Sequence, residues 1–434
     1  MGLKDRTADQ HRNGEAQRAD HEIIRLRGML LEQVDLDGLG ALSPTRRRAR
    51  LESVVGDLVT RECPVLSNLE RRTLIRRIVD EALGLGVLEP LLADETVTEI
   101  MVNGPDRIWV ERSGRLERVP TRFASEAQLY QTIDRIVGQV NRRVDESSPM
   151  VDARLPSGER VNVVIPPLCL TGPTLTIRRF PRAFTMDELV EGGTLDDAVR
   201  SLLGALVRAR CNVVISGGTG TGKTTLLNAL SGFVPDWERI VTIEDAAELR
   251  LQQPHVVSLE ARPANVEGKG HVTIRDLVRN TLRMRPDRII VGEVRGGETL
   301  DMLQAMNTGH EGSLTTVHAN SAEDAISRLQ TLASMAELSI TFEALCDQIN
   351  SAVDVIVHLS RYADGSRRIE EVAAVVSQRR EPSRLATIAE FVPNPAGPER
   401  RVTGRFVHHP LPAGLQQRLT QAGEVALDAF QVRP

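Results

Sequence analysis

The chain has 434 residues, of which 41% are hydrophobic, 26% charged and 3% aromatic, and its formal net charge is −5. This length and composition predict a globular protein of two or three domains. The acidic balance and the scarcity of aromatic side chains argue against a dedicated nucleic-acid surface, because such surfaces are basic and often stack bases on aromatic rings.

The sequence also lacks the patterns of zinc-binding, secreted and membrane-spanning proteins. Its four cysteines stand alone, with no Cys-x-x-Cys or Cys/His pairing, so we expect reduced thiols. The opening residues "MGLKDRTADQHRNGEAQRADHE" are polar where a secretory signal would be apolar, and no run of about 18 apolar residues occurs. We therefore expect a cytoplasmic protein that associates with a membrane only as a peripheral subunit.

The first 94 residues divide into a polar arm and a helical segment. Residues 1–45 are polar and charged, which predicts a flexible arm with one helix around "HEIIRLRGMLLEQV". In residues 46–94, apolar side chains recur at three- and four-residue spacing in "LESVVGDLVTRE" and "NLERRTLIRRIVDEALGLG". Gly84 and Gly86 mark a helix stop, so a small helical bundle is predicted.

Residues 95–185 change to a period of two, which is typical of strands. The stretch "VTEIMVNGPDRIWVERSGRLERV" contains two turn signals between alternating segments, and a helical pattern follows in "SEAQLYQTIDRIVGQV". Strand-like segments return in "GERVNVVI" and "PTLTIRRF". The pattern predicts a compact α/β domain.

In residues 186–380, β-branched strands such as "NVVISG", "RIVTIED", "DRIIVGEV" and "SLTTVHA" alternate with helical segments. Such alternation predicts a parallel sheet with helices on both faces. The stretch "VDVIVHLSRYADGSRRIEEVAAVV" predicts a hairpin that turns at Asp364-Gly365. Residues 381–434, dotted with proline and glycine, are expected to form a short C-terminal appendage.

The stretch "VISGGTGTGKTTLLNAL" carries the strongest chemical signal. It satisfies G-x-x-x-x-G-K-[ST], and a strand pattern precedes it while a helix pattern follows. In such a loop the main-chain N–H groups wrap phosphates, Lys223 would contact the β- and γ-phosphates, and the Thr224 hydroxyl would bind Mg²⁺. The alternative is an incidental glycine-rich turn. The predicted nucleotide-binding residues are Gly217, Gly218, Thr219, Gly220, Thr221, Gly222, Lys223, Thr224 and Thr225.

Hydrolysis also needs a second acidic contact to magnesium and a group that orients water. The strand in "RIIVGEVRGGE" ends in Glu293, which suits a Walker-B-like acid, although a solvated glutamate is the alternative. In "IVTIEDAAELRL", Glu248 is our first candidate for the general base and Glu244 the second. The alternative there is a helix N-cap at Asp245, with Glu248 completing a capping box.

Two histidines bracket the apolar strand in "NTGHEGSLTTVHANSAEDAISRL". His318, which follows the strand, could contact a γ-phosphate or respond to its loss, whereas a structural role is the alternative for either histidine. No carboxylate or cysteine spacing supports a metal site around His310 and His318.

Several arginines of the smaller domain are candidates for a charge that reaches the γ-phosphate. They are Arg154 and Arg160 in "DARLPSGERVN", and Arg178 in "TIRRF". Because adjacent strand residues face opposite ways, at most one of Arg178 and Arg179 should point toward a nucleotide. Generic surface charge is the alternative for each.

These motifs together resemble the secretion-superfamily ATPases, the traffic motors of type II and type IV secretion and of type IV pili. The resemblance rests on "GGTGTGKTT", "IEDAAEL", "RPDRIIVGEVRG" and "MNTGHEGSLTTVHANS", of which the last is the most specific. Further matches in "DARLPSGERVNVVIPP", "GPTLTIRRF", "SAVDVIVHLSRYADGSRRIEEV" and "VTGRF" resemble the CpaF-like branch of tight-adherence (Flp-type) pilus assembly. One departure is Glu311 in "GHEGS", where the family pattern has aspartate.

The resemblance implies an α/β fold in which a RecA-like P-loop ATPase domain follows a smaller N-terminal α/β domain and a short helical bundle. It implies a homo-hexameric ring that binds ATP with Mg²⁺ between the two domains and docks under an inner-membrane platform protein, peripheral to the cytoplasmic face. The working residues would be Lys223, Thr224, Glu248, Glu293 and His318, with Arg154, Arg160 and Arg178 approaching the γ-phosphate.

Other nucleotide-driven classes fit less well. A GTPase would carry Asn-Lys-x-Asp, and an ABC-type subunit would carry Leu-Ser-Gly-Gly-Gln; neither run is present. A ring-shaped DNA translocase or a conjugation-associated ATPase remains as the alternative, although the net charge and few aromatics give no support to a specific nucleic-acid partner. A non-catalytic nucleotide switch is a further alternative, against which the acids and the lysine count.

Overall fold

In the computed structural model of the protein, the chain forms two compact units, Met1–Pro181 and Arg182–Pro434. The structure describes residues 44–63, 65–112, 115–140, 142–179, 184–262, 269–336, 340–378, 380–395, 401–424 and 427–431. The expected arm at residues 1–45, with its helix, therefore lies almost entirely outside the described residues. The boundary between the units falls a few residues before the domain end that we expected at 185.

Two helices precede the sheet of the first unit. Helix α3 spans Pro44–Glu62 and α4 spans Asn68–Leu83. At the start of α4, the hydroxyl of Ser67 accepts from the Glu70 N–H and the Glu70 carboxylate accepts from the Ser67 N–H. This reciprocal cap satisfies two donors that a helix terminus leaves open. The helices pack through a small apolar cluster of their own: Leu51, Val55, Leu58, Val59, Ile78 and Val79.

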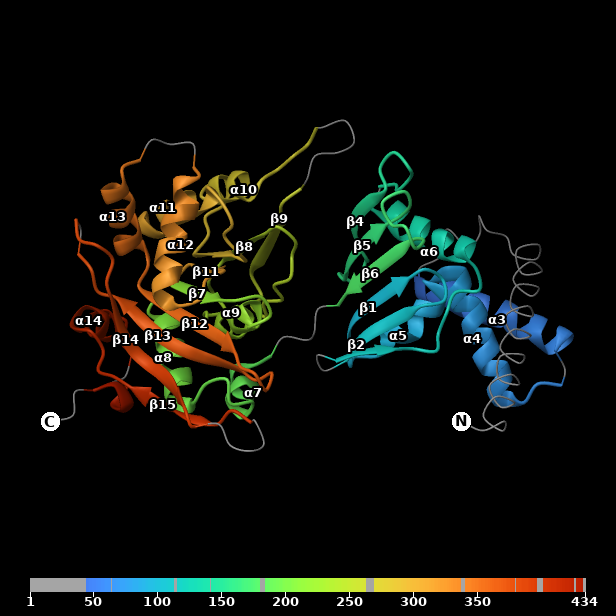
Figure 1. The fold of residues 1–434 in the computed structure, drawn as a ribbon, viewed down its shortest axis with the longest axis horizontal. Coiled ribbons are helices and arrows are strands. Elements are labelled where there is room, and N and C mark those ends of the chain that lie inside the picture. The colour runs from blue at the N-terminus through green and yellow to red at the C-terminus, as the bar shows by residue number, and fades with distance from the viewer. Residues whose placement is uncertain are drawn as a thin grey trace. The chain divides into compact units, whose positions relative to one another are not determined.

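The rest of the first unit is an antiparallel sheet of six strands in the order β3-β2-β1-β6-β5-β4 (Figure 1). The strands are β1 (Val97–Asn103), β2 (Ile108–Arg112), β3 (Arg115–Arg118), β4 (Met150–Arg154), β5 (Arg160–Val164) and β6 (Thr174–Arg178). Helix α6 (Glu126–Gln139) packs its apolar side against one face, and η1 (Gly86–Leu88) and α5 (Glu89–Ala93) join the same core. Along β4 and β5, buried apolar side chains alternate with more exposed ones, most of them polar, as the period of two predicts. The more exposed side chains form the other face of the sheet.

The second unit contains a sheet of nine strands in the order β15-β14-β13-β12-β7-β11-β10-β8-β9. Strands β12, β7, β11, β10, β8 and β9 are parallel, and β13, β14 and β15 continue the sheet antiparallel. Their bounds are β7 (Val213–Gly217), β8 (Ile240–Glu244), β9 (Val256–Glu260), β10 (Arg288–Val291), β11 (Leu314–Val317), β12 (Val355–Arg361), β13 (Arg367–Val375), β14 (Leu385–Pro393) and β15 (Gly404–His408).

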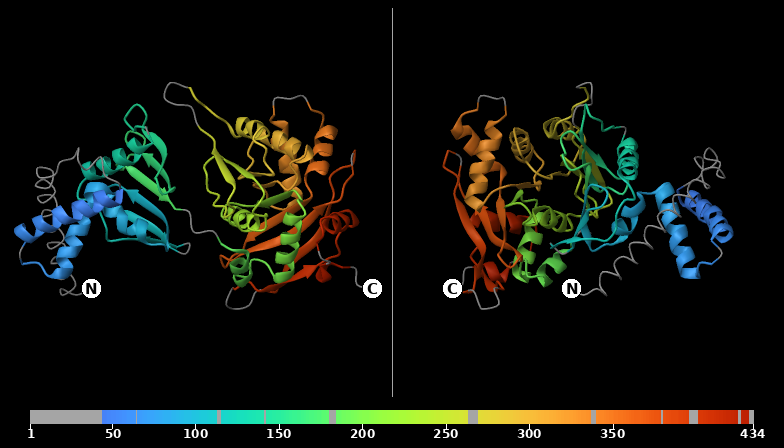
Figure 2. Two further views of the ribbon diagram at one scale, coloured as in Figure 1. Left: turned by 180° about the vertical axis from the view of Figure 1, so that it is seen from behind. Right: turned by 45° about the vertical axis from the view of Figure 1, so that its right-hand side comes forward.

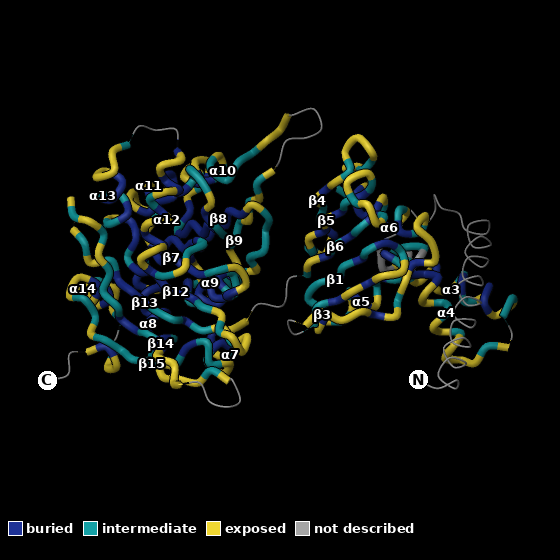
Figure 3. The backbone as a smooth tube through the Cα atoms, in the orientation of Figure 1, coloured by how far each residue is buried: buried dark blue, intermediate teal, exposed yellow. Residues whose placement is uncertain are grey.

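Helices cover both faces of this sheet, as the alternating pattern predicted (Figures 1 and 2). One set packs on the face of Val213, Ile215 and Val357: α7 (Met186–Glu191), α8 (Asp197–Arg208), α9 (Lys223–Ser231) and α14 (Ala413–Gln421). The other set packs on the face of Val214 and Ile356: α10 (Ile274–Thr281), α11 (Glu298–Asn307), α12 (Ala322–Ser334) and α13 (Phe342–Ala352). Both cores appear as the buried interior of this unit in Figure 3. A 3-10 turn, η2, spans Asp428–Phe430.

The end of the chain, residues 381–434, which we expected to form a short C-terminal appendage, continues the sheet. Strands β14 and β15 extend the sheet, and Leu415, Leu419 and Phe430 lie in the same core as the P-loop strand. The expected hairpin at Asp364-Gly365 is confirmed as the turn between β12 and β13, where Gly365 has a φ of 86°. Among the residues that the structure describes, no helix is long and apolar enough to cross a membrane.

Candidate active site

The glycine-rich loop connects β7 to α9, in the strand–loop–helix context that its sequence requires. Gly217, Gly220 and Gly222 have φ values of 153°, 72° and 99°, a region that favours glycine. A Cβ on Gly217 would lie 2.5 Å from the Leu359 carbonyl oxygen, so a side chain there would collide with main chain of the neighbouring strand β12. Both backbone conformation and close packing therefore require glycine at position 217.

The loop has the donors that an anionic ligand needs. The main-chain N–H groups of Gly218–Gly222 make no hydrogen bond to any described residue. Helix α9 begins at Lys223, directly after the loop, so its N-terminal partial positive charge faces the same place. These groups fit a nucleotide's phosphates, because each can donate to a phosphate oxygen without losing a protein partner.

Lys223 is buried, and its Nζ donates to the carbonyls of Gly217 and Gly218, both at 2.9 Å. Burial lowers the pKa of this lysine, while the negative charge of Glu293 acts in the opposite direction. The ammonium group is thus held at the start of the loop by two consecutive carbonyls, and it lies 3.4 Å from Nδ1 of His318.

Glu293 and His318 come to this lysine from two neighbouring strands. His318 follows β11 and Glu293 follows β10, and the sheet order β7-β11-β10 places both beside the loop. His318 Nε2 lies 2.9 Å from Glu293 Oε1, and Arg295 Nη2 donates to Glu293 Oε2 at 2.7 Å. Burial and the Lys223 ammonium lower the pKa of His318, which favours the neutral imidazole. A cavity of about 370 Å³ opens here, lined by Thr219, Glu293, Val294, Arg295, His318 and Arg328.

The residues present also fit Mg²⁺. The Thr224 hydroxyl lies in the first turn of α9 and Glu293 supplies a carboxylate at the adjoining strand end, and both are oxygen donors of the type that Mg²⁺ prefers. No group of three or more His, Cys, Asp or Glu able to hold a metal occurs in the described part of the chain. At phosphate sites Mg²⁺ has few protein ligands, and phosphate and water complete its shell.

Glu244 and Glu248 have different environments. Glu244 ends β8 and is buried, and its Oε1 accepts from the main-chain N–H groups of Glu248 at 2.8 Å and Leu249 at 3.0 Å. Glu248 is half-buried, and its charge acts on Arg295. The alternative of a helix N-cap at Asp245 is wrong, because residues 245–250 form bends and irregular chain instead of a helix. The hydrogen bonds from Glu248 and Leu249 to the Glu244 carboxylate hold this segment in its non-helical conformation.

The three arginine candidates of the first unit lie in one row. Arg154 of β4 is the register partner of Arg160 of β5, which is in turn the partner of Arg178 of β6. Directly paired residues share a face, and this face is the one opposite helix α6. Arg179 faces the other way and donates to the carbonyls of Asp94 and Val97, so it is tied into the first unit, as strand alternation predicted.

The structure separates the two histidines. His310 lies in the turn before β11 and His318 after its end, so the strand stands between them. The His310 carbonyl accepts from the Ser313 hydroxyl at 2.8 Å, which closes that turn. Only His318 belongs to the loop's surroundings.

Sequence reasoning missed two arginines beside the phosphate loop. Strand β12 lies next to β7, and its last residue, Arg361, is paired with Arg367 of β13. Arg361 Nη1 lies 3.9 Å from where a Cβ on Gly220 would be, and Arg367 Cδ lies 3.7 Å from the corresponding position on Gly222. Neither guanidinium has a hydrogen bond or ion pair with a described residue. The hairpin signal located them in sequence, but only the strand order brings them to the loop.

Among solved structures, the crystal structure titled as the pilus retraction motor PilT with bound ADP matches 66% of this chain and 81% of its own, with 21% identity and a TM-score of 0.50. This likeness shows the fold, a RecA-like ATPase domain preceded by a smaller N-terminal domain.

Relatives in sequence are closer. A Mycobacterium tuberculosis protein whose name assigns it provisionally to conjugal transfer is 42% identical over 318 residues, covering 72% of this chain and 90% of the relative. The conjugal transfer protein TrbB of Rhizobium radiobacter is 37% identical over 294 residues, covering 66% and 86%. Residues 81–400 match the family described as Type II/IV secretion system protein. The chain therefore belongs to the type II/IV secretion system protein family, a family of secretion ATPases.

Proposed function

We propose that this chain is an ATP-hydrolysing motor that works as a homo-hexamer and powers pilus assembly in the tight-adherence (Flp-type) branch of its family. The observation that carries the proposal is the meeting of Lys223, His318 and Glu293 at the ends of three neighbouring parallel strands, with contacts of 3.4 and 2.9 Å. An incidental glycine-rich turn gives no reason for an imidazole and a carboxylate to reach its lysine from two other strands.

In the proposed binding step, ATP places its phosphates on the N–H groups of Gly218–Gly222. Lys223 then exchanges the carbonyls of Gly217 and Gly218 for phosphate oxygens, which are stronger acceptors because they are charged. Mg²⁺ held at Thr224 and the Glu293 carboxylate would neutralise charge on the phosphates.

In the proposed hydrolytic step, Glu248 accepts the proton of the attacking water. Glu244 lies nearby, but two main-chain N–H groups hold its carboxylate, so we assign it to positioning the segment that carries Glu248. His318 stands between the lysine that binds the γ-phosphate and the acid Glu293, which suits a residue that responds when that phosphate leaves.

Arginines would supply the charge that stabilises the transition state. We propose that the row of Arg154, Arg160 and Arg178 faces a nucleotide in the assembled motor, bound to its own or to a neighbouring subunit. Arg361 and Arg367 lie beside Gly220 and Gly222 of the loop, so we assign them to binding the phosphates of ATP before the reaction.

The assignment to the Flp-type branch rests on the motifs "DARLPSGERVNVVIPP", "GPTLTIRRF", "SAVDVIVHLSRYADGSRRIEEV" and "VTGRF". In that branch the ring docks peripherally, on the cytoplasmic face, under an inner-membrane platform protein. A conjugation-associated ATPase is the second candidate, and it is supported by the conjugal transfer names of the two relatives.

The test measures ATP turnover of the full chain with and without its neighbours. Lys223→Ala should abolish steady-state phosphate release, while Lys269→Ala, which removes an exposed lysine of the same unit, should leave it unchanged. Unchanged turnover in Lys223→Ala would refute the motor. Co-purification with membrane proteins encoded beside the chain separates the branches: a prepilin among the neighbours supports pilus assembly, whereas a relaxase or stimulation by DNA supports conjugation.

A further inference from the structure

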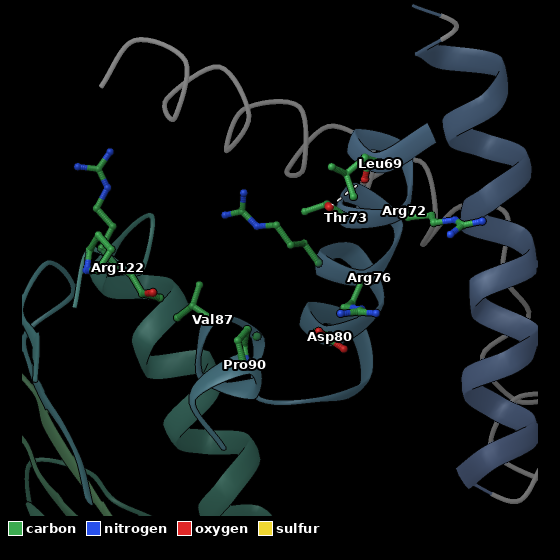
Figure 4. A pocket seen from close by; sticks show the side chains of 12 residues that line it. Leu69, Arg72, Thr73, Arg76, Asp80, Val87, Pro90 and Arg122 are labelled. Atoms are coloured by element: carbon green, nitrogen blue, oxygen red, sulfur yellow. Dashed lines mark hydrogen bonds between the residues drawn. The ribbon is translucent and has the colours of Figure 1, made fainter. Parts of the chain in front are cut away.

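We propose that a basic cavity in the first unit binds a phosphorylated anion, at a site separate from the phosphate loop. The cavity has a volume of about 660 Å³ and lies between helix α4 and the segment Pro120–Arg122 (Figure 4). Figure 4 shows Arg76 and Thr73 on the α4 side, Arg122 on the opposite side, and Val87 and Pro90 between them. None of these residues takes part in the proposed hydrolysis.

The lining of the cavity is strongly positive. Four arginines line it: Arg72, Arg76, Arg77 and Arg122. The one carboxylate among its lining residues, Asp80, is nearly buried and accepts from Arg48 Nη2 at 2.7 Å. Since Arg48 already neutralises Asp80, no carboxylate in the lining remains to balance the charge of Arg72, Arg76 and Arg122.

This charge stands out against the rest of the protein. The whole chain is acidic, with a net charge of −5, yet residues 44–83 contain nine arginines against six aspartates and glutamates. Arg72 and Arg76 are one helical turn apart on α4, where like charges repel. Neither they nor Arg122 form a hydrogen bond or ion pair with any residue in the described ranges. A bound anion would be attracted by both guanidinium groups and would offset the repulsion between them.

The chemistry of the lining selects the ligand. Planar guanidinium groups bind phosphate through paired N–H donors, and several together favour a ligand with more than one phosphate oxygen exposed. The volume lies in the range of small-molecule sites and exceeds what a single phosphate ion would fill. Two sources share this chemistry: a soluble compound with a pyrophosphate group and the headgroup of an anionic phospholipid.

Exposed apolar side chains beside the cavity are consistent with the second source, the headgroup of an anionic phospholipid. Leu69 lines the cavity and is 77% exposed, and Val65, in the turn before α4, is 95% exposed. Exposed apolar side chains beside arginines fit a bilayer surface, where basic groups meet headgroups and apolar groups enter the acyl boundary. The experiment therefore contains one arm for each source.

Binding is measured on the full chain with Mg²⁺ and saturating ADP, so that the phosphate loop is filled. In the first arm, inorganic pyrophosphate is titrated in a calorimeter. In the second, the protein is sedimented with vesicles of phosphatidylglycerol and phosphatidylcholine, and with vesicles of phosphatidylcholine alone. The variant Arg76→Gln/Arg122→Gln removes one guanidinium from each side of the cavity. The matched control Arg46→Gln/Arg50→Gln removes the same charge from exposed positions of α3 that do not line the cavity.

We expect the unchanged protein to bind at least one probe, and the cavity variant to bind it about tenfold or more weakly, since charge-assisted contacts of this kind are each worth about a factor of ten. The α3 control should stay within about twofold. Binding of pyrophosphate identifies a soluble ligand, and binding only to phosphatidylglycerol vesicles identifies a lipid. Failure of both probes, or equal weakening in both variants, would overturn the proposal. Unchanged thermal unfolding and ATP turnover confirm that the cavity variant is folded.

Discussion

Arg288 provides the sharpest test of how the sheet holds the candidate site. It begins β10, the strand that leads to Glu293, and its side chain is fully buried. Its Nε and Nη2 donate to the Glu238 carboxylate at 2.5 and 3.3 Å, and its Nη1 donates to the carbonyls of Val207 and Gly312 at 2.8 and 3.2 Å. The substitution Arg288→Met keeps a long unbranched chain but removes the charge and all four contacts.

The expected loss is large because the Glu238 carboxylate would remain buried without its cation. Breaking a buried pair from one side costs about 3–5 kcal/mol. In a unit of this size each kcal/mol lowers Tm by about 2–4 °C, so the variant should melt roughly 10 °C below the unchanged protein. The double variant Arg288→Met/Glu238→Leu should recover much of this loss in stability, because no unpaired carboxylate then remains buried. Recovery stays incomplete, because the Gly312 carbonyl loses its donor at a cost of about 1–3 kcal/mol, whereas the Val207 carbonyl still accepts from the Arg210 N–H.

The assay is thermal unfolding of the full chain followed by circular dichroism, with Arg405→Met as control. Arg405 is an exposed arginine of β15, so its substitution should shift Tm by no more than about 2 °C. Glu238→Leu alone completes the cycle. If the double variant is as unstable as the two single losses added together, the two side chains are not coupled and the account of the buried pair is refuted.

Four further outcomes follow from the site. Glu293→Gln should leave ATP affinity within about threefold and lower turnover by about 100-fold or more, because its proposed contact with Mg²⁺ would matter most when charge develops on the phosphates in the transition state. An equal loss in affinity and turnover would contradict this. Gly217→Ala brings a Cβ to 2.5 Å from a main-chain oxygen, so nucleotide affinity and Tm should both fall; equilibrium binding at the unchanged affinity would refute the steric account. Arg361→Gln with Arg367→Gln should raise the KM for ATP about tenfold with a smaller change in kcat, and a pure kcat effect would exclude phosphate binding by these side chains. Burial and the neighbouring Lys223 ammonium lower the pKa of His318 from its ordinary 6.5, so kcat/KM should stay constant as the pH falls through 6.5 and decline only at lower pH. His318→Gln should remove this decline. A decline centred at or above pH 6.5 in the unchanged protein would contradict the neutral imidazole.

The parts of the fold that could be predicted from the sequence are those that depend on residues close together in the chain. The phosphate loop is a single run in which glycines, lysine and helix follow one another, and its strand and helix were predicted on both sides. The hairpin between β12 and β13 was likewise predicted, because Asp364-Gly365 is a turn signal between two strand patterns. Strand alternation correctly separated Arg178 from Arg179, since a period of two fixes which side chains share a face.

The parts that could not be predicted depend on which distant strands pair. Nothing local in the sequence states that β12 lies beside β7, yet that pairing alone brings Arg361 to the phosphate loop. The same holds for β14 and β15: proline and glycine suggested an appendage, but unpaired edges of a sheet favour further pairing and the chain extends it. Local pattern also suggested, as an alternative, a helix N-cap at Asp245, but in the structure the Glu244 carboxylate accepts from two main-chain N–H groups and no helix forms there.

The contacts within the site imply that, in the proposed motor, nucleotide binding and rearrangement are one event. Lys223 is already bonded to two loop carbonyls, and Glu293 is already held by His318 and Arg295. A triphosphate that takes more than one N–H of the lysine displaces at least one of those carbonyls, and an acid held by an arginine must shift to serve the phosphates. Part of the binding free energy therefore goes into breaking these contacts, which weakens the affinity for ATP. It also makes the positions of Lys223, Glu293 and His318 depend on whether nucleotide is bound. Because Glu293 and His318 sit at the ends of adjoining strands, the shift passes directly to the segments that follow β10 and β11. Loss of the γ-phosphate would let Lys223 return to the carbonyls, which is the reversible exchange that a cyclic motor requires.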